Sequence, residues 1–337
     1  MTDLFKVGVW NDIKEETIPK DLKIYYANLK QLVLNSKSTN TFKSYHYSFR
    51  TFCKWCNKYK FIPVPAKDHH VAIYLSFLQS SNPSVSKINT AIYSILWAHI
   101  ISGYNDPCKS SLVKQVKEGI LRKISKPIIA KEPITPDHLK KLVNMFGSGQ
   151  NLLDLRCVTM CLVGYAGFLR FNEIVNIRRN DIIFEEKQLK IYISKSKTDQ
   201  LKKGRWLIIS KTGNSTCPVN CLLRYLTAFE IKDENCDFVF RKAVFVKKLN
   251  KHVLRKGVIS YTRAREILLE KLELIGLDKS KFGLHSLRSG GASFAANHGV
   301  SERLLKKHGR WKTDFAKDGY IRESDEIRRS VSLNLGI

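Results

Sequence analysis

The stretch that decides the fold runs from His285 to Ile321 and reads HSLRSGGASFAANHGVSERLLKKHGRWKTDFAKDGYI. His285 and Arg288 stand three residues apart, so they share one face of a helix. Trp311 and Tyr320 follow in the same stretch. If its helices fold back on one another, these four side chains can converge on one anion. The pattern predicts attack by the Tyr320 oxygen on a phosphodiester, with cations holding the phosphate oxygens.

An arginine upstream supplies one further cation. Arg170 closes the apolar run GYAGFLR at residues 164–170, and Glu173 follows it. A buried lone cation is costly, so a structural salt bridge to Glu173 is one interpretation of this arginine. The other is a phosphate clamp, which the order of the remaining candidates favours.

A lysine between two predicted strands supplies the second cation. The alternation of residues 188–194 and 205–209 predicts a β-hairpin. Lys195 and Lys197 lie in its connection. Hairpin tips are exposed, so an ordinary solvated charge is the alternative to a catalytic lysine.

Six residues in this order resemble the active-site set of the tyrosine recombinases, also called phage-type integrases. They are Arg170, Lys197, His285, Arg288, Trp311 and Tyr320. The resemblance covers roughly residues 38–325 and is strongest over 164–198 and 284–322. Members of the family carry histidine or tryptophan at the position of Trp311. Gly309-Arg310-Trp311 stands in place of the more usual Leu-Gly-His. That departure, with the Ser-Lys-Thr-Asp-Gln run, is more similar to eukaryotic mobile-element recombinases of the DIRS and crypton type than to bacterial Xer proteins.

The resemblance implies a role for each residue. Arg170 and Arg288 would clamp the phosphate in bidentate fashion and help depress the pKa of the nucleophile Tyr320, whose phenol ordinarily titrates near 10. His285 would move a proton and hold the phosphate. Lys197, preferred over Lys195 because it directly precedes a Thr-Asp turn, would protonate the leaving 5′ hydroxyl. Trp311 would pack against Tyr320 and donate its indole hydrogen to the phosphate.

The implied reaction forms a covalent 3′-phosphotyrosine, which the 5′ hydroxyl of a partner strand then attacks. The resemblance implies no metal, ATP or other cofactor. Because recombination joins two duplexes, the expected assembly is a homotetramer on DNA, with the tail 326–337 as a candidate for docking on a neighbour.

Charge identifies the expected partner. The formal net charge is +28, from 58 basic and 30 acidic residues, and such a field attracts polyanions, so double-stranded DNA is expected. No apolar stretch approaches membrane-spanning length, so no membrane partner is expected. We expect an intracellular protein, nuclear if it belongs to a eukaryotic mobile element and otherwise cytoplasmic. The eight cysteines are expected to be reduced, with Cys53 and Cys56 as core thiols rather than zinc ligands.

The expected fold is mainly α with a small antiparallel β-sheet. The resemblance implies a helical core-binding (SAM-like) domain and an α+β catalytic domain. We predict an N-terminal extension at 1–37, the core-binding domain at 38–125, a Pro-rich linker at 126–136, the catalytic domain at 137–325 and a tail at 326–337. Residues 1–20 show little periodicity and are expected to be partly ordered at best.

Basic residues outside the six are candidate DNA contacts. The helix expected after Ser38 carries an aromatic core face and a basic face, which is either simply solvated or also follows phosphates. The basic segment 241–256 is expected to be a connecting loop over the DNA. The candidate contacts are Lys43, Arg50, Lys54, Lys114, Lys117, Arg122, Lys195, Lys202 and Lys203.

Two alternatives to a recombinase remain. A type IB topoisomerase uses a similar set of residues, but usually has lysine at the position of His285. A catalytically inactive DNA-binding protein on the same fold would be expected to have lost part of the set, and all six positions are filled here.

Overall fold

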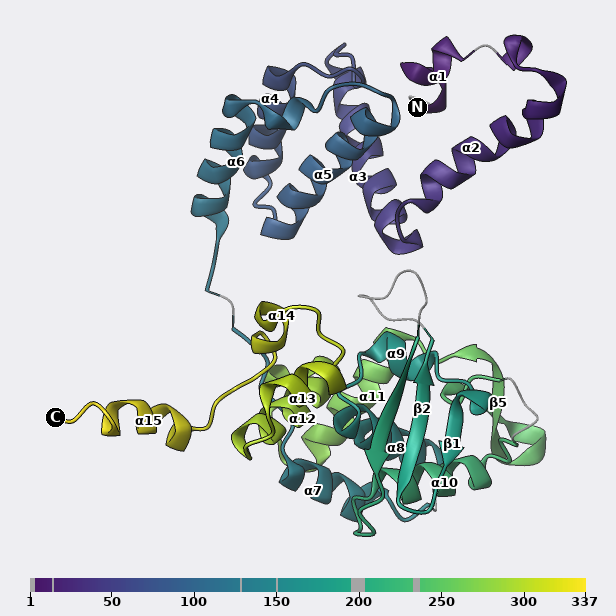
Figure 1. Ribbon diagram of the computed structural model, residues 1–337, viewed down its shortest axis with the longest axis vertical. Coiled ribbons are helices and arrows are strands. Elements are labelled where there is room, and N and C mark those ends of the chain that lie inside the picture. Colours follow the sequence, from purple (N-terminus) through teal and green to yellow (C-terminus); the bar gives the residue numbers. More distant parts are fainter. Residues whose placement is uncertain (1–3, 14, 128, 150, 195–203, 233–236) are drawn as a thin grey trace. The chain divides into compact units, whose positions relative to one another are not determined.

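The computed structural model describes residues 4–13, 15–127, 129–149, 151–194, 204–232 and 237–337. The chain divides into two compact units, Met1–Ile128 and Ile129–Ile337 (Figure 1). Each unit has its own hydrophobic core. Helices dominate both, and the described strands form two small antiparallel sheets in the second unit. The predicted fold class, mainly α with little β, is therefore confirmed.

The first unit is a helical bundle whose elements follow the apolar periodicity of the sequence. Its main helices are α2 (Lys23–Asn35), α3 (Thr39–Lys58), α4 (Asp68–Ser80), α5 (Val85–Ile101) and α6 (Ser111–Ile124). Each of the helices α3, α5 and α6 begins after a serine, Ser38, Ser84 or Ser110. The serine side chain accepts a hydrogen bond from a backbone N–H of the first turn, which would otherwise have no partner within the helix. The side of these helices away from the core also exposes some apolar side chains, among them Leu32, Phe77 and Ile100.

The first residues of the chain pack more closely than expected. Helix α1 (Val9–Asp12) lies against the end of α5, where the Val9 N–H donates to the Ser102 carbonyl over 3.1 Å. The indole Nε1 of Trp10 donates to the Ile101 carbonyl over 2.7 Å. Long-range hydrogen bonds therefore hold this short helix in place, although residues 1–20 show little periodicity.

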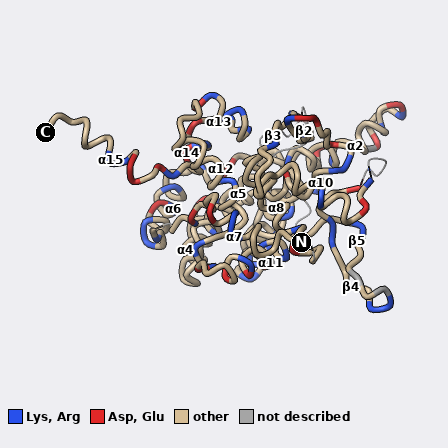
Figure 2. Tube along the Cα trace, turned by 90° about the horizontal axis from the view of Figure 1, so that it is seen from below, with Lys and Arg blue, Asp and Glu red and all other residues tan. Residues whose placement is uncertain are grey.

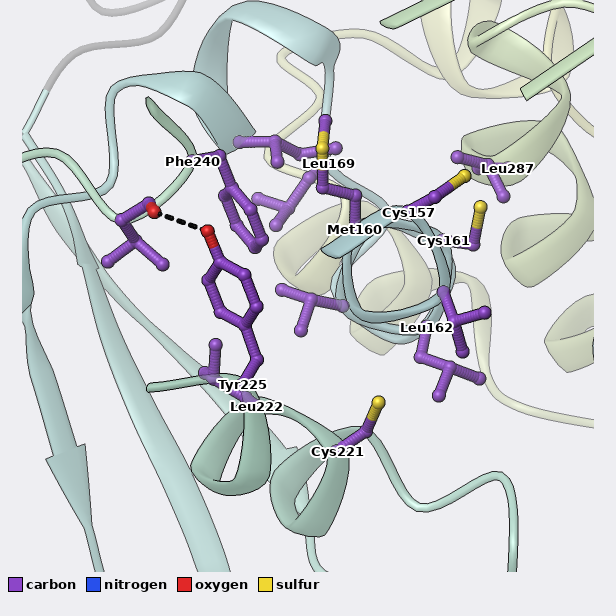
Figure 3. Packing of buried hydrophobic residues seen from close by; sticks show 14 of the residues in the cluster. Cys157, Met160, Cys161, Leu162, Leu169, Cys221, Leu222, Tyr225, Phe240 and Leu287 are labelled. Carbon is purple, nitrogen blue, oxygen red and sulfur yellow. Dashed lines mark hydrogen bonds between the residues drawn. The ribbon is translucent and has the colours of Figure 1, made fainter. Parts of the chain in front are cut away.

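The second unit is built around the buried helix α8 (Leu152–Ala166). Figure 3 shows α8 surrounded by side chains of its neighbours, among them Leu222 and Tyr225 of α10 (Pro218–Ala228). The Tyr225 hydroxyl donates to the Val239 carbonyl over 2.9 Å and so satisfies a polar group in the core. The remaining helices are α7 (Pro136–Phe146), α9 (Phe171–Val175), α11 (Tyr261–Leu274), α12 (His285–Asn297), α13 (Glu302–His308), α14 (Asp314–Asp318) and α15 (Asp325–Leu333).

The larger sheet contains the predicted hairpin. Strands β2 (Gln188–Ile193) and β3 (Arg205–Ser210) pair antiparallel, and β1 (Ile182–Phe184) adds to the other edge of β2. Leu189, Ile191 and Ile193 alternate toward the core, which fixes the register because a one-residue slip would turn them outward.

The basic segment 241–256 is not the connecting loop that its charge suggested. It forms a second hairpin of β4 (Arg241–Val246) and β5 (Lys251–Val258), with Val244 opposite Val253. β-branched pairs stabilise such a ribbon, and its many lysines and arginines are tolerated because much of it is exposed. Figure 2 shows basic residues at its far end.

An extended segment before α7 supports α12, the helix that carries His285 and Arg288. The Glu132 N–H donates to the Lys281 carbonyl over 2.8 Å, and the Ile134 N–H donates to the Ser286 carbonyl over 3.0 Å. Part of the predicted linker 126–136 is therefore packed on the second unit. Ile134 is only 1% exposed.

Close packing explains the two adjacent glycines of α12, Gly290 and Gly291. A Cβ on Gly290 would lie 2.0 Å from the Ile134 carbonyl oxygen, so Gly290→Ala should destabilise the second unit by about 1–3 kcal/mol through overpacking. Gly119→Ala is the matched control, since nothing lies within 4 Å of its added Cβ in α6, and it should stabilise by about 1 kcal/mol. Urea unfolding of both variants measures the difference; equal effects would contradict this packing.

Candidate active site

The turn after α8 places the first arginine. Phe168 adopts a left-handed backbone (φ 45°), which ends the helix and lets Arg170 cap the short helix α9. The Arg170 guanidinium donates to Glu173 Oε1 over 2.8 Å, and its backbone N–H donates to Oε2 over 3.0 Å. The structural salt bridge considered from the sequence therefore exists. It does not exclude a clamp, because the Arg170 side chain keeps 14% exposure and Glu173 orients it.

The second arginine lies in the same cluster but is completely buried. Arg288 Nη1 donates to the Phe168 carbonyl, and Nη2 donates to the Gly309 carbonyl over 2.6 Å. Its Nη1 lies 3.9 Å from Glu173 Oε2. Burial lowers the pKa of Arg288 to about 9, and the like charge of Arg170 contributes. A bound anion would relieve both effects, since it favours the charged guanidinium.

The aromatic candidates pack around this guanidinium. The Arg288 Cζ lies 4.4 Å from the Trp311 ring centroid and 4.8 Å from the Tyr320 ring centroid. The two rings are 5.6 Å apart. His285, exposed on the first turn of α12, has its ring 6.3 Å from that of Tyr320. Five predicted residues from three parts of the chain, Arg170, His285, Arg288, Trp311 and Tyr320, therefore meet in one place.

Two buried donors in this place have no hydrogen-bond partner in the described part of the chain. They are Nε of Arg288 and Nε1 of Trp311. Leaving such a group unsatisfied costs about 1–3 kcal/mol. Because both side chains contact the Tyr320 ring, an anion bound beside the tyrosine could satisfy them.

Electrostatics favour an anion here. Glu173 contacts three arginines, Arg170, Arg288 and Arg310, which gives the four side chains a formal net charge of +2. Burial by itself raises the pKa of Glu173, but Arg310, the Arg170 backbone N–H and the other two guanidinium groups outweigh it and hold that pKa below its usual 4.5. The carboxylate is therefore ionised at neutral pH.

This shift predicts a pH-dependent contribution to stability. Since the folded pKa of Glu173 is depressed, its stabilisation is present above about pH 4.5 and is lost as the pH falls through the folded value. Glu173→Gln should cost about 3–5 kcal/mol at neutral pH, because the arginines lose their shared partner. The difference from wild type should shrink in acid.

Unfolding free energies measured across the acid range check the prediction. Glu185→Gln is the control: the pKa of Glu185 is also lowered, chiefly by its hydrogen bond to Lys190, but the carboxyl is exposed. Its removal should change little at any pH. A Glu173→Gln deficit that stays constant into strong acid would contradict the assignment of the lowered pKa to Glu173.

Several positioning groups were missed from the sequence. The Ser289 and Ser293 hydroxyls donate to the Tyr320 carbonyl over 2.5 and 3.3 Å, and so hold the tyrosine backbone against α12. Their spacing of four residues was the available signal. His308 is half-buried, and its Nε2 donates to the Ala166 carbonyl at the end of α8 over 2.8 Å. It therefore caps that helix.

The other predicted residues fall into two groups. Lys195, Lys197, Lys202 and Lys203 fall between Ile193 and Arg205, outside the described residues. On α3, Lys43, Arg50 and Lys54 are exposed along the face opposite buried Phe49 and Phe52. On α6, Lys114 and Arg122 are exposed and Lys117 is half-buried. The basic side chains on α3 and α6 are therefore accessible to a polyanion.

No described helix has the length and apolar character needed to cross a membrane. Within the described ranges, no three His, Cys, Asp or Glu side chains group closely enough to hold a metal ion.

Residues 132–326 match the model of the Phage integrase family. The chain is 26% identical over 309 residues to an integrase/recombinase xerD homolog of Selenomonas ruminantium, covering 90% of this chain and 87% of that protein.

Solved structures share the fold. XerH site-specific recombinase bound to palindromic difH substrate, in a post-cleavage complex, aligns with a TM-score of 0.61 at 12% identity, covering 96% of this chain and 91% of that chain. A lambda integrase (75–356) dimer bound to a COC′ core site aligns with a TM-score of 0.53 at 13% identity, covering 86% and 90%. The DIRS and crypton likeness stays a prediction.

Proposed function

Because the chain belongs to the phage integrase family of tyrosine recombinases, enzymes of site-specific DNA recombination, we propose that Tyr320 is its nucleophile and attacks a DNA phosphate. The bond from the Tyr320 oxygen to phosphorus forms as the bond from phosphorus to the 5′ oxygen breaks. A 3′-phosphotyrosine results. The 5′ hydroxyl of a partner strand then attacks this linkage, releases Tyr320 and restores a phosphodiester.

The observation that carries this proposal is the placement of Tyr320 beside buried donors. The guanidinium of Arg288 lies 4.8 Å from the Tyr320 ring centroid, and Arg288 Nε and Trp311 Nε1 have no partner in the described structure. A phosphate in contact with these groups would also be adjacent to the tyrosine. Fixed donors around the developing charge are a major source of rate acceleration.

The other residues take roles that follow from their position and chemistry. Arg170, oriented by Glu173, binds a second nonbridging oxygen together with Arg288. His285, exposed beside Tyr320, takes part in proton movement. Lys197 is the proposed general acid toward the leaving 5′ oxygen, on the family resemblance. None of these steps uses a cofactor.

The substrate follows from relatives and from charge. XerH and lambda integrase were solved on their DNA sites, and we assign double-stranded DNA to this chain as well. The exposed basic face of α3, with Lys43, Arg50 and Lys54, is a proposed phosphate contact. Lys114, Lys117 and Arg122 of α6 are a second set.

A homotetramer on DNA is the proposed working assembly. Helix α15 has no buried residue and exposes Val331 and Leu333, 68% and 81% accessible. These apolar side chains suit docking of the tail on a neighbouring copy. Crosslinking of the protein with and without a recombination site should yield four linked copies only with DNA; a dimer as the largest species would contradict the tetramer.

A suicide-substrate assay tests the reaction. Wild-type protein is incubated in EDTA with nicked duplexes that carry the element's terminal sequence, and a protein–DNA adduct is sought on a denaturing gel. We expect an adduct on the 3′ phosphate and joining to a second duplex. Relaxation of supercoils without joining would instead favour the type IB topoisomerase alternative. Salt-sensitive binding without an adduct would favour an inactive binding protein.

A further inference from the structure

Arg310 is a third buried arginine beside the site, and its backbone is unusual. The Arg310 N–H bonds to the Lys307 carbonyl, and the Trp311 N–H bonds to the Lys306 carbonyl. This pair of bonds closes α13 as a Schellman motif, with Arg310 at the position that adopts a left-handed backbone. Its φ is 57°, a conformation that glycine adopts without strain and other residues rarely do. The backbone alone would favour glycine, so the side chain must supply the compensation.

The contacts of the side chain show what that compensation is. The buried Arg310 guanidinium donates to Glu173 Oε2 over 2.9 Å and to the Phe168 carbonyl over 3.0 Å. It also donates to the Gly167 carbonyl over 3.2 Å and the His308 carbonyl over 2.6 Å. These acceptors lie in the turn before Arg170, in α9 and at the end of α13. The guanidinium therefore binds the groups that orient the two phosphate-binding arginines.

Glu173 is the link between Arg310 and the chemistry. One of its oxygens is held by the Arg170 side chain, while Oε2 is shared by the Arg170 N–H and Arg310. Arg288 Nη1 stands 3.9 Å from Oε2, too far for a hydrogen bond. If Arg310 were absent, the nearest replacement cation for this buried carboxylate would be Arg288, after a shift of about 1 Å to hydrogen-bonding distance.

Such a shift would disturb the reaction. A buried carboxylate strongly favours a paired cation, and an Arg288 recruited by Glu173 would turn away from the phosphate. Displacements of this size can cost about 100-fold in rate. Arg288 and Arg310 also share the Phe168 carbonyl, which accepts a hydrogen bond from each of them.

We propose that Arg310 is a positioning residue, which occupies Glu173 and the Phe168 carbonyl so that Arg288 stays directed toward the DNA phosphate. This inference rests on the proposed function. Arg310 itself does not bind the phosphate. Arg310, where this sequence departs from the more usual Leu-Gly-His motif, thus has a function in this active site.

The test compares five proteins: wild type, Arg310→Gly, Glu173→Gln, the double variant and a control. Each is measured by its first-order rate of adduct formation at saturating protein, and separately by its dissociation constant for DNA. Arg310→Gly suits the left-handed backbone and removes the charge. It should lower the adduct rate by about 30-fold or more, with DNA binding changed by about threefold or less, since the lost charge is buried. Arg303→Ala is the control, because Arg303 is an exposed arginine of α13, and its adduct rate should stay within about twofold of wild type.

The double variant Arg310→Gly with Glu173→Gln separates positioning from structural loss. With the carboxylate neutralised, Arg288 is no longer recruited, so this protein should cleave about fivefold or more faster than Arg310→Gly alone, a coupling that independent sites would not show. A folded Arg310→Gly protein with wild-type rate overturns the proposal. So does a double variant that is slower than either single variant, or a loss that lies entirely in DNA affinity.

Three further outcomes are also decisive. If Arg310→Gly is unfolded at the assay temperature, Arg310→Gln takes its place, because it removes the same charge with a side chain of more similar size, and the same rescue by Glu173→Gln is required. If wild type itself forms no adduct, the proposed reaction fails and the role of Arg310 fails with it. If wild type forms the adduct and the rescue is absent, only the role of Arg310 is overturned.

Discussion

Tyr320→Phe will form no covalent adduct with DNA, while it folds and binds DNA as wild type does. The substitution removes only the hydroxyl, the atom that would bond to phosphorus. The ring that packs 5.6 Å from Trp311 and 4.8 Å from the Arg288 guanidinium remains. The backbone of residue 320 also stays bound to Ser289 and Ser293, because those bonds use its carbonyl. The nucleophile should therefore be lost without loss of the site.

The suicide-substrate gel measures adduct formation, and a binding titration on the same DNA measures affinity. Tyr261→Phe is the matched control: Tyr261 is 47% exposed on α11, and its ring contacts Phe171, a contact that phenylalanine preserves. It should form the adduct at a rate within about twofold of wild type. An adduct formed by Tyr320→Phe would mean that another side chain is the nucleophile.

Arg288→Lys should lower the cleavage rate by about 100- to 1,000-fold, the loss typical of removing one donor to a developing oxyanion. Lysine keeps the charge but lacks the planar fork. It cannot donate at once to the Phe168 carbonyl, the Gly309 carbonyl and a phosphate. Stability should also fall, by about 1–3 kcal/mol, since a buried acceptor loses its partner.

Single-turnover cleavage and denaturant unfolding separate the two effects. Arg156→Lys is the control, because Arg156 is also a buried arginine of the second unit and donates to the Arg241 carbonyl over 2.8 Å, yet is absent from the proposed site. It should lose comparable stability and keep its cleavage rate within about twofold at a temperature where it stays folded. Equal losses of rate in both variants would show that Arg288 acts only through stability.

Much of this protein could be predicted from the sequence because the deciding signals are local. Apolar residues at helical spacing placed α3, α5 and α8, and strict alternation placed β2 and β3. The candidate site could also be predicted, because its histidine, arginines, tryptophan and tyrosine are chemically distinctive and follow one another in a fixed order. Local charge was a poorer guide: the basic segment 241–256 was interpreted as a loop, but it forms the strands β4 and β5.

What only the tertiary structure decided are the contacts between distant residues. Arg310 meets Glu173 across 137 positions, and Arg288 meets the Phe168 carbonyl across 120. Neither a carbonyl direction nor a left-handed φ at Phe168 and Arg310 leaves a periodic signal in the sequence. The sequence by itself thus determined which side chains could carry the chemistry. Packing decided which arginines share one carboxylate, because that depends on how α8, α12 and α13 close on one another.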